Sequence, residues 1–317
     1  MLDGLLLFVG LALLITGAHF LVAGACTVAA RLGVSNLVIG LTIVSLGTSL
    51  PELLVTLVSG LQGRADLAIA NVVGSNIANV LLVLGVAAII RPLPVRDSTI
   101  LSEIPFSLTA ALLVGFLANA HLFSDYLELS LSRLDGTILL SFLLLFLVYV
   151  YKISGMKVIS EDPTDSASSM PRAIAYILLG SLGLFFGGQW AVEGAIGLAQ
   201  VWGVDDALIG LTIIAVGTSS PELVASAVAA YRNQTDIAVG NVVGSNIFNL
   251  LWVLGFTSSV VELPFEVVNN IDLILVIASS VLIFLALATS RINTVMRIHG
   301  ALFVVLYVAY LAYVVQR

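Results

Sequence analysis

Hydrophobic residues follow one another along this chain in long stretches, and polar residues gather in the short segments between them. Ten of these stretches are long enough to cross a bilayer, which takes about 20 residues in a helix. Their approximate limits are 4–30, 36–60, 67–90, 99–120, 135–152, 172–200, 206–230, 237–261, 271–290 and 295–315. The pattern therefore predicts an all-α integral membrane protein with ten transmembrane helices.

The same pattern of residues returns at an offset of 170 positions. IGLTIVSLGTSLPELL at 39–54 returns as IGLTIIAVGTSSPELV at 209–224. NVVGSNIANVLLVLG at 71–85 returns as NVVGSNIFNLLWVLG at 241–255. Four glycines of the first stretch also align with four glycines of the sixth at this offset. The repeat unit therefore holds five of the ten predicted spans.

A unit with an odd number of spans reverses its orientation when it is repeated in series. We therefore expect two inverted five-helix repeats, a known arrangement in transporters whose site lies at the repeat interface. The first repeat covers 1–155 with its motif at 39–85, and the second covers 172–317 with its motif at 209–255. Residues 156–171 would form the linker between them.

Basic residues indicate which side of the membrane each connecting segment faces. With the N-terminus outside, the cytoplasmic segments carry nine Lys and Arg residues and the outer segments carry three. An excess of Lys and Arg is typical of cytoplasmic loops. We therefore expect a multi-pass protein of the prokaryotic cytoplasmic membrane, with both termini outside and the link at 152–171 in the cytoplasm. The nine are Arg31, Arg91, Arg96, Lys152, Lys157, Arg172, Arg232, Arg291 and Arg297, and the three are Arg64, Arg133 and Arg317.

Composition agrees with a membrane protein. Hydrophobic residues make up 60% of the chain and charged residues only 10%, whereas soluble domains carry about 25% charged residues. No basic stripe suggests nucleic-acid binding, and the single cysteine, Cys26, cannot form an internal disulfide. The lipid bilayer is the expected surrounding, and the sequence indicates no obligate protein partner.

Each motif places one glutamate after a proline inside a hydrophobic stretch. GTSLPE ends at Glu52 and GTSSPE ends at Glu222. Proline removes a backbone donor and glycine loosens a helix, so we expect a break that frees carbonyls around 45–48 and 215–218. A carboxylate at membrane depth is costly and usually marks an ion or proton pathway.

The second part of each motif adds further oxygen-bearing side chains. In GSNIAN, Ser75 and Asn79 are four residues apart and share one helix face; in GSNIFN the same holds for Ser245 and Asn249. One turn earlier stand Asn71 and Asn241, which are second-tier ligand candidates or interhelical hydrogen-bond donors. Oxygen ligands with two carboxylates suit a hard cation such as Ca²⁺.

At these residues the chain resembles the Ca²⁺/cation antiporter superfamily, in particular its prokaryotic Na⁺/Ca²⁺ exchanger-like branch. The resemblance covers essentially the whole chain and implies alternating access to ion sites midway across the membrane. It implies that Glu52 and Glu222 are shared ligands of Ca²⁺ and Na⁺, and that Asn79 and Asn249 line the centre. The remaining implied ligands are the carbonyls of Thr48 and Thr218 for Ca²⁺, and for Na⁺ the residues Ser49, Ser75, Ser219 and Ser245 with the carbonyls of Ser45 and Ala215.

The chain departs from the family pattern at one position. Some relatives carry Asp where this chain has Asn249, so two carboxylates remain here. Their charge balances one Ca²⁺, two Na⁺ or two protons. The position that usually holds Gln in proton-coupled relatives is Asn, which favours Na⁺.

The leading hypothesis is a secondary antiporter that expels Ca²⁺ as Na⁺ enters, with no cofactor besides the transported ions. The alternative keeps the fold and couples Ca²⁺ to H⁺, or to another cation. A passive cation channel is a remote third hypothesis, because the repeats offer one occluding site and no ring of carboxylates. An enzyme is not expected, since the sequence has no HExxH motif or Ser–His pair.

Overall fold

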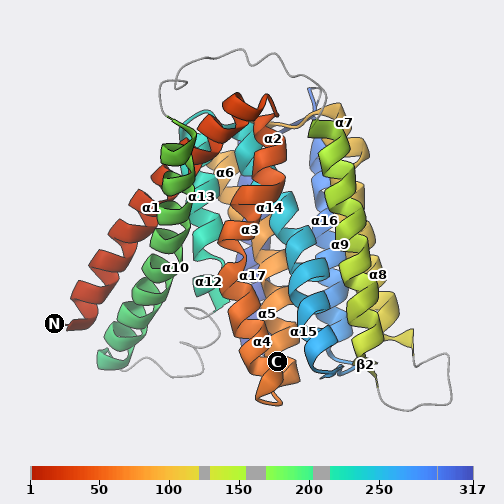
Figure 1. Ribbon diagram of the computed structural model, residues 1–317. Coiled ribbons are helices and arrows are strands. Elements are labelled where there is room, and N and C mark those ends of the chain that lie inside the picture. The colour runs from red at the N-terminus through yellow and green to blue at the C-terminus, as the bar shows by residue number, and fades with distance from the viewer. Residues whose placement is uncertain (1, 121–128, 155–168, 203–214, 291, 317) are drawn as a thin grey trace.

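The computed structural model of the chain describes residues 2–120, 129–154, 169–202, 215–290 and 292–316. Most of these residues are helical, and the long helices run between the same two ends of the molecule (Figure 1). In that view the upper end holds α2 and α7, and the lower end holds β2 and the tip of α4.

The first half contains α1 (Leu2–Leu32), α2 (Asn36–Ile39), the π-helical segment η1 (Gly40–Val44), α3 (Ser45–Thr48), α4 (Leu50–Leu61), α5 (Ala65–Ala78), the π-helical segment η2 (Asn79–Leu84), α6 (Gly85–Ile90), β1 (Leu93–Pro94), α7 (Asp97–Leu101), α8 (Glu103–Ala118), β2 (Ser130–Leu131) and α9 (Arg133–Ser154). The second half contains α10 (Met170–Val201), α12 (Ala215–Gly217), α13 (Ser220–Tyr231), α14 (Thr235–Ile247), the π-helical segment η5 (Phe248–Val253), α15 (Leu254–Val260), β3 (Leu263–Pro264), α16 (Asn269–Thr289), β4 (Thr294–Val295) and α17 (Arg297–Gln316).

The described residues support most of the predicted spans. Eight helices are long and apolar enough to cross a membrane, and the bent pair Asn36–Thr48 and Leu50–Leu61 is a ninth candidate. The predicted span at 206–230 begins within 203–214, outside the described residues, and its remainder forms α12 and α13. The chain is therefore a multi-pass membrane protein.

Two short strand pairs were not expected from the sequence. β1 pairs with β4, and β2 pairs with β3, both antiparallel. Each pair joins a two-residue strand of the first half to one of the second half. The fold is thus mostly helical rather than wholly α, because extended connections between spans find partners at the ends of the bundle.

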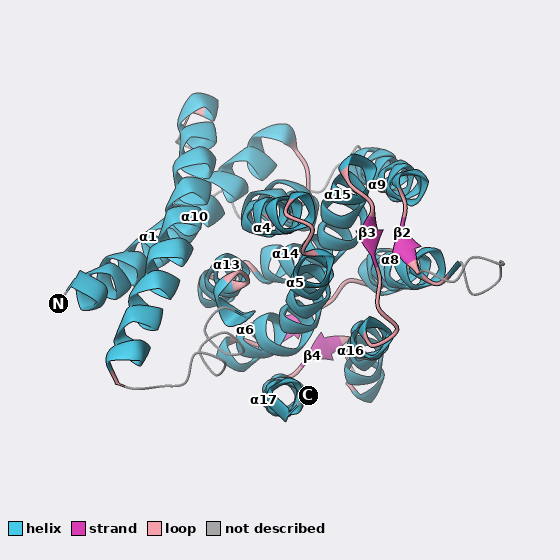
Figure 2. Cartoon of the chain, turned by 90° about the horizontal axis from the view of Figure 1, so that it is seen from below, coloured by secondary structure: helices cyan, strands magenta, loops and turns pink. Residues whose placement is uncertain are grey.

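The second parts of the two motifs lie in the core. In the spans Ala65–Ile90 and Thr235–Val260, 72% and 94% of the most apolar window is buried, against 17% in α17. Figure 2 shows α5 and α14 near the centre, with α4, α13, α8 and α16 around them. Residues on α14 are therefore shielded by protein on nearly all sides, and α5 is exposed only near its start.

Helices α1 and α10 lie side by side at one edge of the molecule (Figures 1 and 2). Glycines form their contact: a Cβ added to Gly17 would lie 2.9 Å from the Gly180 carbonyl oxygen, and one added to Gly10 would lie 2.8 Å from that of Gly187. Small residues let membrane helices approach this closely. Gly10 and Gly17 of the first predicted span therefore pack against Gly187 and Gly180 of the sixth.

Tight turns bring the two parts of each motif together. The turn from α4 to α5 contains Gly63 with φ 72°, and the turn from α13 to α14 contains Asn233 with φ 61°. Glycine and asparagine are the residues that adopt this left-handed backbone most readily. Each turn folds a Pro–Glu helix back onto the helix that carries GSN.

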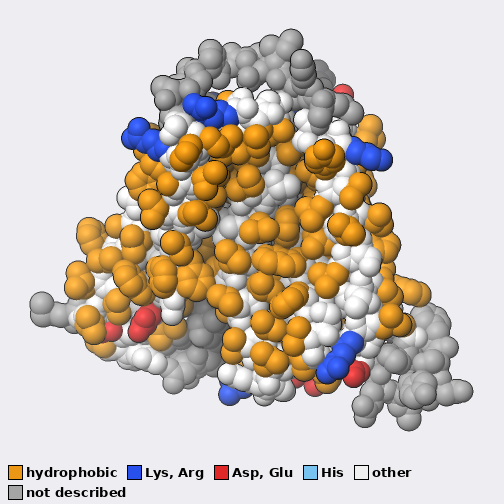
Figure 3. All heavy atoms as spheres, in the orientation of Figure 1, with side chains coloured by type: hydrophobic (Ala, Val, Ile, Leu, Met, Phe, Trp, Pro, Cys, Tyr) orange, Lys and Arg blue, Asp and Glu red, His pale blue; other side chains and the backbone are white. Residues whose placement is uncertain are grey.

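The surface carries a broad hydrophobic band. Figure 3 shows hydrophobic side chains over the middle of the molecule and Lys and Arg side chains near its two ends. Large apolar residues stay exposed, such as Leu144 at 62% and Val305 at 63%. This distribution is the one expected of a surface that contacts lipid.

Candidate ion-binding site

The local fold of both motifs places a glutamate in the first turn of a helix. The helix pair Asn36–Thr48 and Leu50–Leu61 bends by 44° at Ser49. Ser49 has φ −85° and ψ 4°, and Ser219 has φ −85° and ψ 5°. Pro51 and Pro221 are the second residues of α4 and α13, in the first turn, where a helix leaves backbone N–H groups without partners in any case.

The break is narrower than the sequence suggested. We expected the Ser45 carbonyl to be freed, but it accepts a hydrogen bond from the Ser49 amide at 2.9 Å. The chain leaves the helix at one residue only, because proline interferes with a single turn. In the second copy the Gly217 carbonyl, four residues before Pro221, accepts a hydrogen bond from the Ser220 hydroxyl at 2.7 Å.

The fold brings the candidate side chains of both repeats into one buried cluster. Glu52 and Glu222 are both 0% exposed, and Thr218 is half-buried. Ala215 begins α12 at the same level of the motif as Ser45. The other buried members are Ser45, Thr48, Ser49, Ser75, Asn79, Ser219, Ser245 and Asn249.

Contacts cross between the repeats inside this cluster. The Ser49 hydroxyl donates to Glu222 Oε1 at 3.4 Å. The Thr48 and Ser245 hydroxyl oxygens are 3.4 Å apart. The first repeat therefore contributes a hydroxyl to the surroundings of the second repeat's glutamate, and the two repeats are in direct contact.

Several buried polar atoms of the cluster have no hydrogen-bond partner among the described residues. A buried carboxylate without a partner is costly, and an oxygen-coordinated cation would satisfy the oxygens in this set. These atoms are both carboxylate oxygens of Glu52, Oε2 of Glu222, the hydroxyls of Ser75 and Ser219, Oδ1 of Asn79, and Oδ1 and Nδ2 of Asn249. The described part of the chain contains no group of three or more His, Cys, Asp or Glu side chains suited to a metal ion. A cation here would be held by two carboxylates and neutral oxygens.

The two second-tier asparagines hold the glutamate helices. Asn71 Nδ2 donates to Thr56 Oγ1 at 3.0 Å and to the Glu52 carbonyl at 3.4 Å. Asn241 Nδ2 donates to Ser226 Oγ at 2.9 Å and to the Glu222 carbonyl at 3.5 Å. These interhelical bonds match one of the two interpretations given above for the asparagines.

Sequence reasoning missed three residues that the structure brings to the cluster. Thr56 and Ser226 accept the asparagine bonds, and Asn246 Oδ1 accepts from Asn79 Nδ2 at 3.1 Å. The repeat itself carried a signal for the first two, because each motif has a hydroxyl residue four positions after its glutamate.

A cavity of about 580 Å³ opens beside the cluster. Its lining includes Pro51, Pro221 and Thr218, and on α10 Gln189 and Glu193. Thr218 therefore borders an accessible space. Its counterpart in the first copy, Thr48, is 0% exposed.

Comparison with known proteins adds evidence from outside the structure. The sequence model of the family "Sodium/calcium exchanger protein" matches residues 3–152 and 172–316. The chain is 33% identical over 344 residues to "Sodium/calcium exchanger MaX1" of Methanosarcina acetivorans, covering 97% of each chain. It is 37% identical over 261 residues to "Inner membrane protein YrbG" of Escherichia coli, covering 79% of this chain and 77% of that protein.

The fold is also similar to a solved transporter. Crystals of the sodium-calcium exchanger NCX_Mj soaked with 10 mM Na⁺ and zero Ca²⁺ gave a structure that matches with a TM-score of 0.82 and 32% sequence identity, covering 98% of both chains. The same exchanger soaked with 10 mM Na⁺ and 10 mM Sr²⁺ matches with a TM-score of 0.81.

Proposed function

The chain belongs to the sodium/calcium exchanger protein family and exchanges Ca²⁺ for Na⁺, and we propose that it does so at the buried cluster around Glu52 and Glu222. The observation that carries this assignment is the set of buried oxygen atoms without partners. Both Glu52 oxygens and one Glu222 oxygen belong to it. A transported cation is the partner that such a set lacks.

Charge explains the coupling in this proposal. Two carboxylates carry a charge of minus two, which one Ca²⁺ or two Na⁺ would balance. Because Glu52 and Glu222 lie in one cluster and serve both ions, Ca²⁺ and Na⁺ cannot occupy the centre together. Exchange then follows from competition, since the protein changes its facing side only with the charges neutralised.

The remaining donors divide between the two ions. Carbonyls of Thr48 and Thr218 complete the Ca²⁺ ligands in this proposal, and Asn79 and Asn249 line the centre. The Na⁺ ligands are Ser49, Ser75, Ser219 and Ser245 with the carbonyls of Ser45 and Ala215. Burial of the described members of this set, together with the unpartnered hydroxyls of Ser75 and Ser219, supports the assignment.

The two motif regions belong, we propose, to inverted five-helix repeats at 1–155 and 172–317, linked by 156–171. The matching backbone at Ser49 and Ser219 and the matching turns at Gly63 and Asn233 support this relation. Ten spans follow if 206–230 crosses the membrane.

The distribution of basic residues supports an orientation with both termini outside and 152–171 in the cytoplasm. In the prokaryotic cytoplasmic membrane, such an exchanger would expel Ca²⁺ as Na⁺ enters.

Flux into proteoliposomes tests the site. Purified full-length chain would take up radioactive Ca²⁺ under an imposed Na⁺ gradient, and Glu52→Gln or Glu222→Gln would abolish this uptake. A pH gradient at matched voltage would not replace the Na⁺ gradient. Removing one partner of a buried charge pair costs about 3–5 kcal/mol. We therefore expect the uptake rate to fall by at least roughly 100-fold.

Glu103→Gln is the matched control, because Glu103 is also a buried glutamate in a membrane helix. It is 1% exposed and accepts a hydrogen bond from the Tyr149 hydroxyl at 2.7 Å, which a Gln side chain would keep. Uptake that persists in both Glu52→Gln and Glu222→Gln would refute the site.

A further inference from the structure

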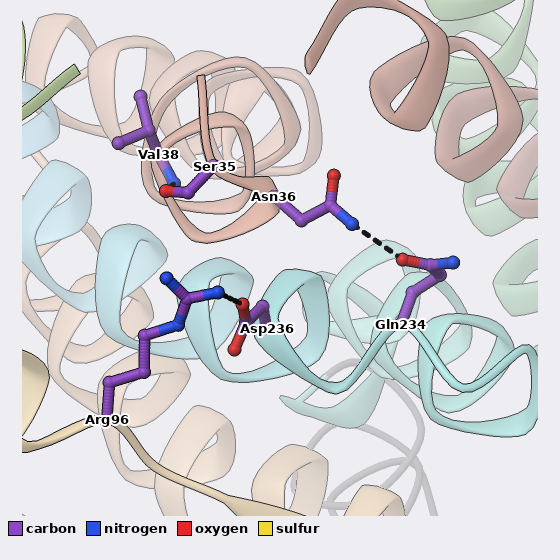
Figure 4. Close-up of polar contacts among 6 residues, drawn as sticks. All are labelled: Ser35, Asn36, Val38, Arg96, Gln234 and Asp236. Atoms are coloured by element: carbon purple, nitrogen blue, oxygen red, sulfur yellow. Dashed lines mark hydrogen bonds and ion pairs between the residues drawn. The ribbon is translucent and has the colours of Figure 1, made fainter. Parts of the chain in front are cut away.

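Helix α14 packs against α2, η1 and α3, from the cluster toward the upper end of the molecule. Figure 4 shows the outermost contacts: Asn36 Nδ2 donates to Gln234 Oε1 at 2.8 Å, and Arg96 forms an ion pair with Asp236. All four residues lie where α2 and the segment before α7 meet the start of α14. The two repeats are therefore joined on this side.

Closer to the cluster the same interface continues through Asn241. The Ser45 hydroxyl lies 3.1 Å from the Asn241 carbonyl oxygen, and the Thr48 hydroxyl donates to Asn241 Oδ1 at 3.2 Å. Asn241 Nδ2 meanwhile donates to Ser226 on α13. The Asn241 side chain thus uses its amide hydrogens within its own repeat and its amide oxygen across to the other repeat.

The equivalent asparagine of the first repeat, Asn71, makes the hydrogen bond within its own repeat but, in the described part of the chain, not the one across to the other repeat. Asn71 Nδ2 donates to Thr56, as Asn241 does to Ser226. Yet Asn71 makes no hydrogen bond to Thr218 among the described residues, and Thr218 borders the cavity instead. The cross-repeat bond is present on one side of the cluster and absent on the other.

A glycine lets α14 approach η1 closely on the side of the first motif. A Cβ on Gly244 would lie 2.8 Å from the Leu41 carbonyl oxygen, whereas a Cβ on Gly74 would have no described atom within 4 Å. α14 is thus in close contact with η1, whereas the counterpart of η1 at 209–214 lies outside the described residues. Among the described residues, Thr48 is fully buried and Thr218 borders the cavity.

We propose that Asn71 and Asn241 are paired positioning residues whose cross-repeat hydrogen bonds alternate during exchange. In the state described here Thr48 donates to Asn241. In the opposite state Thr218 donates to Asn71 Oδ1, and the Thr48–Asn241 bond is open. Each asparagine holds its own glutamate carbonyl in both states through Nδ2, so the switch leaves the ion ligands in place.

The physical argument is that a two-state protein needs contacts that differ between its states. One buried hydrogen bond changes the ratio of two states by about fivefold. The proposal rests on the proposed function, because the alternation matters only if the two motifs act as equivalent halves of one exchanger. The switch adds to the proposed function the residues whose hydrogen bonds determine which of the two motif regions is closed.

Threonine-to-valine substitutions test the switch, since valine removes the hydroxyl and keeps the main-chain carbonyl. The readout is the labelling rate of Gln189→Cys, in the cavity, by a membrane-impermeant thiol reagent in a Cys26→Ser background. The Na⁺ concentration is fixed at the value at which the protein with both threonines intact is labelled at half its maximal rate. Thr48→Val should shift the ratio of states about fivefold away from the open cavity, and Thr218→Val about fivefold toward it.

The double variant Thr48→Val with Thr218→Val should return the ratio close to the starting value, because both states then lose one bond. Thr218→Ser keeps the hydroxyl and should leave the ratio unchanged. Thr42→Val is a matched control, because its hydroxyl bonds to the Val38 carbonyl of its own helical segment. If Thr48→Val does not fold, Thr48→Ala takes its place.

Shifts in the same direction for both single variants, or no shift in either, would overturn the switch. The labelling readout needs no transport, so its outcome is separate from that of the proposed function. Loss of uptake in Glu52→Gln with equal labelling in both threonine variants would keep the ion site and discard the switch. Uptake retained in both glutamate variants would discard the ion site itself.

Discussion

The two copies of the GTS-x-PE motif have nearly the same sequence and different surroundings. In the first copy Thr48 is fully buried and bonded to Asn241, and in the second copy Thr218 borders a cavity. Identical backbone at Ser49 and Ser219 shows that the difference does not come from the break itself. On the side of the first copy, α14 is in close contact with η1. Two copies of nearly the same sequence therefore have two different environments in this structure.

The largest expected effect is at the two glycines. Gly244→Ala would place a methyl group 2.8 Å from the Leu41 carbonyl oxygen and 2.9 Å from Leu41 Cα, both backbone atoms. Overpacking of this kind costs about 1–3 kcal/mol, so the melting temperature in detergent should fall. Gly74→Ala meets no described atom and should leave the melting temperature unchanged or raise it slightly. Equal destabilisation by both would show that the two interfaces are alike.

The next effect separates the two asparagines. Asn241→Leu removes the hydrogen bonds that the buried hydroxyls of Thr48 and Ser226 make with Asn241, and should lower the free energy of unfolding by about 2 kcal/mol. Asn71→Leu replaces a half-buried residue and removes its hydrogen bond to the Thr56 hydroxyl. It should lower the free energy of unfolding by about 1 kcal/mol. Denaturant titration of the two variants measures the difference. A larger decrease in the free energy of unfolding for Asn71→Leu would contradict the assignment of the Thr48–Asn241 interface as the closed side.

A smaller effect is expected where the copies differ in sequence. Ser45 donates to the Gly40 carbonyl at 2.6 Å and also lies near the Asn241 carbonyl, while its counterpart is Ala215. Ser45→Ala makes the copies alike and should weaken the closed side by about 1 kcal/mol. The Gln189→Cys labelling rate would then fall. An unchanged rate would mean that the Ser45 hydroxyl bonds only within its own helix.

The smallest effect is expected at the edge of the closed interface. Arg96 and Asp236 form an ion pair with side chains that are 44% and 23% exposed. Exposed pairs contribute about 0–1 kcal/mol and are screened by salt. Arg96→Gln should therefore change labelling of Gln189→Cys only at low ionic strength, and Asp236→Asn on that background should add nothing. A salt-independent effect would point to a role beyond the ion pair.

Sequence patterns predicted most of the described helices. The length of the hydrophobic stretches predicted the spans. A spanning segment must be long enough to cross the hydrocarbon region, and it must be helical because its backbone groups can find hydrogen-bond partners there only within the helix. Proline and glycine located the break before Glu52 and Glu222, since both act on the local backbone. The strand pairs could not be predicted, because two-residue strands carry no periodicity.

The partners within the cluster were harder to predict than its members. Asn246 accepts from Asn79, but the motif spacing alone put Asn246 on another face of α14. The freed carbonyl expected at Ser45 was wrong, because the Ser49 amide still reaches it across the break. Such contacts depend on the exact path of the main chain, which residue type does not specify.

The sequence by itself determined the family, the membrane character, the repeat and the oxygen-rich residues around two glutamates. These follow from local chemistry: apolar length, helix-breaking residues and the cost of a charge in lipid. Only the tertiary structure decided that Thr48 is sealed and Thr218 is accessible. Two copies of one motif have almost the same intrinsic preferences, so the difference between them arises from which neighbouring helix is in contact.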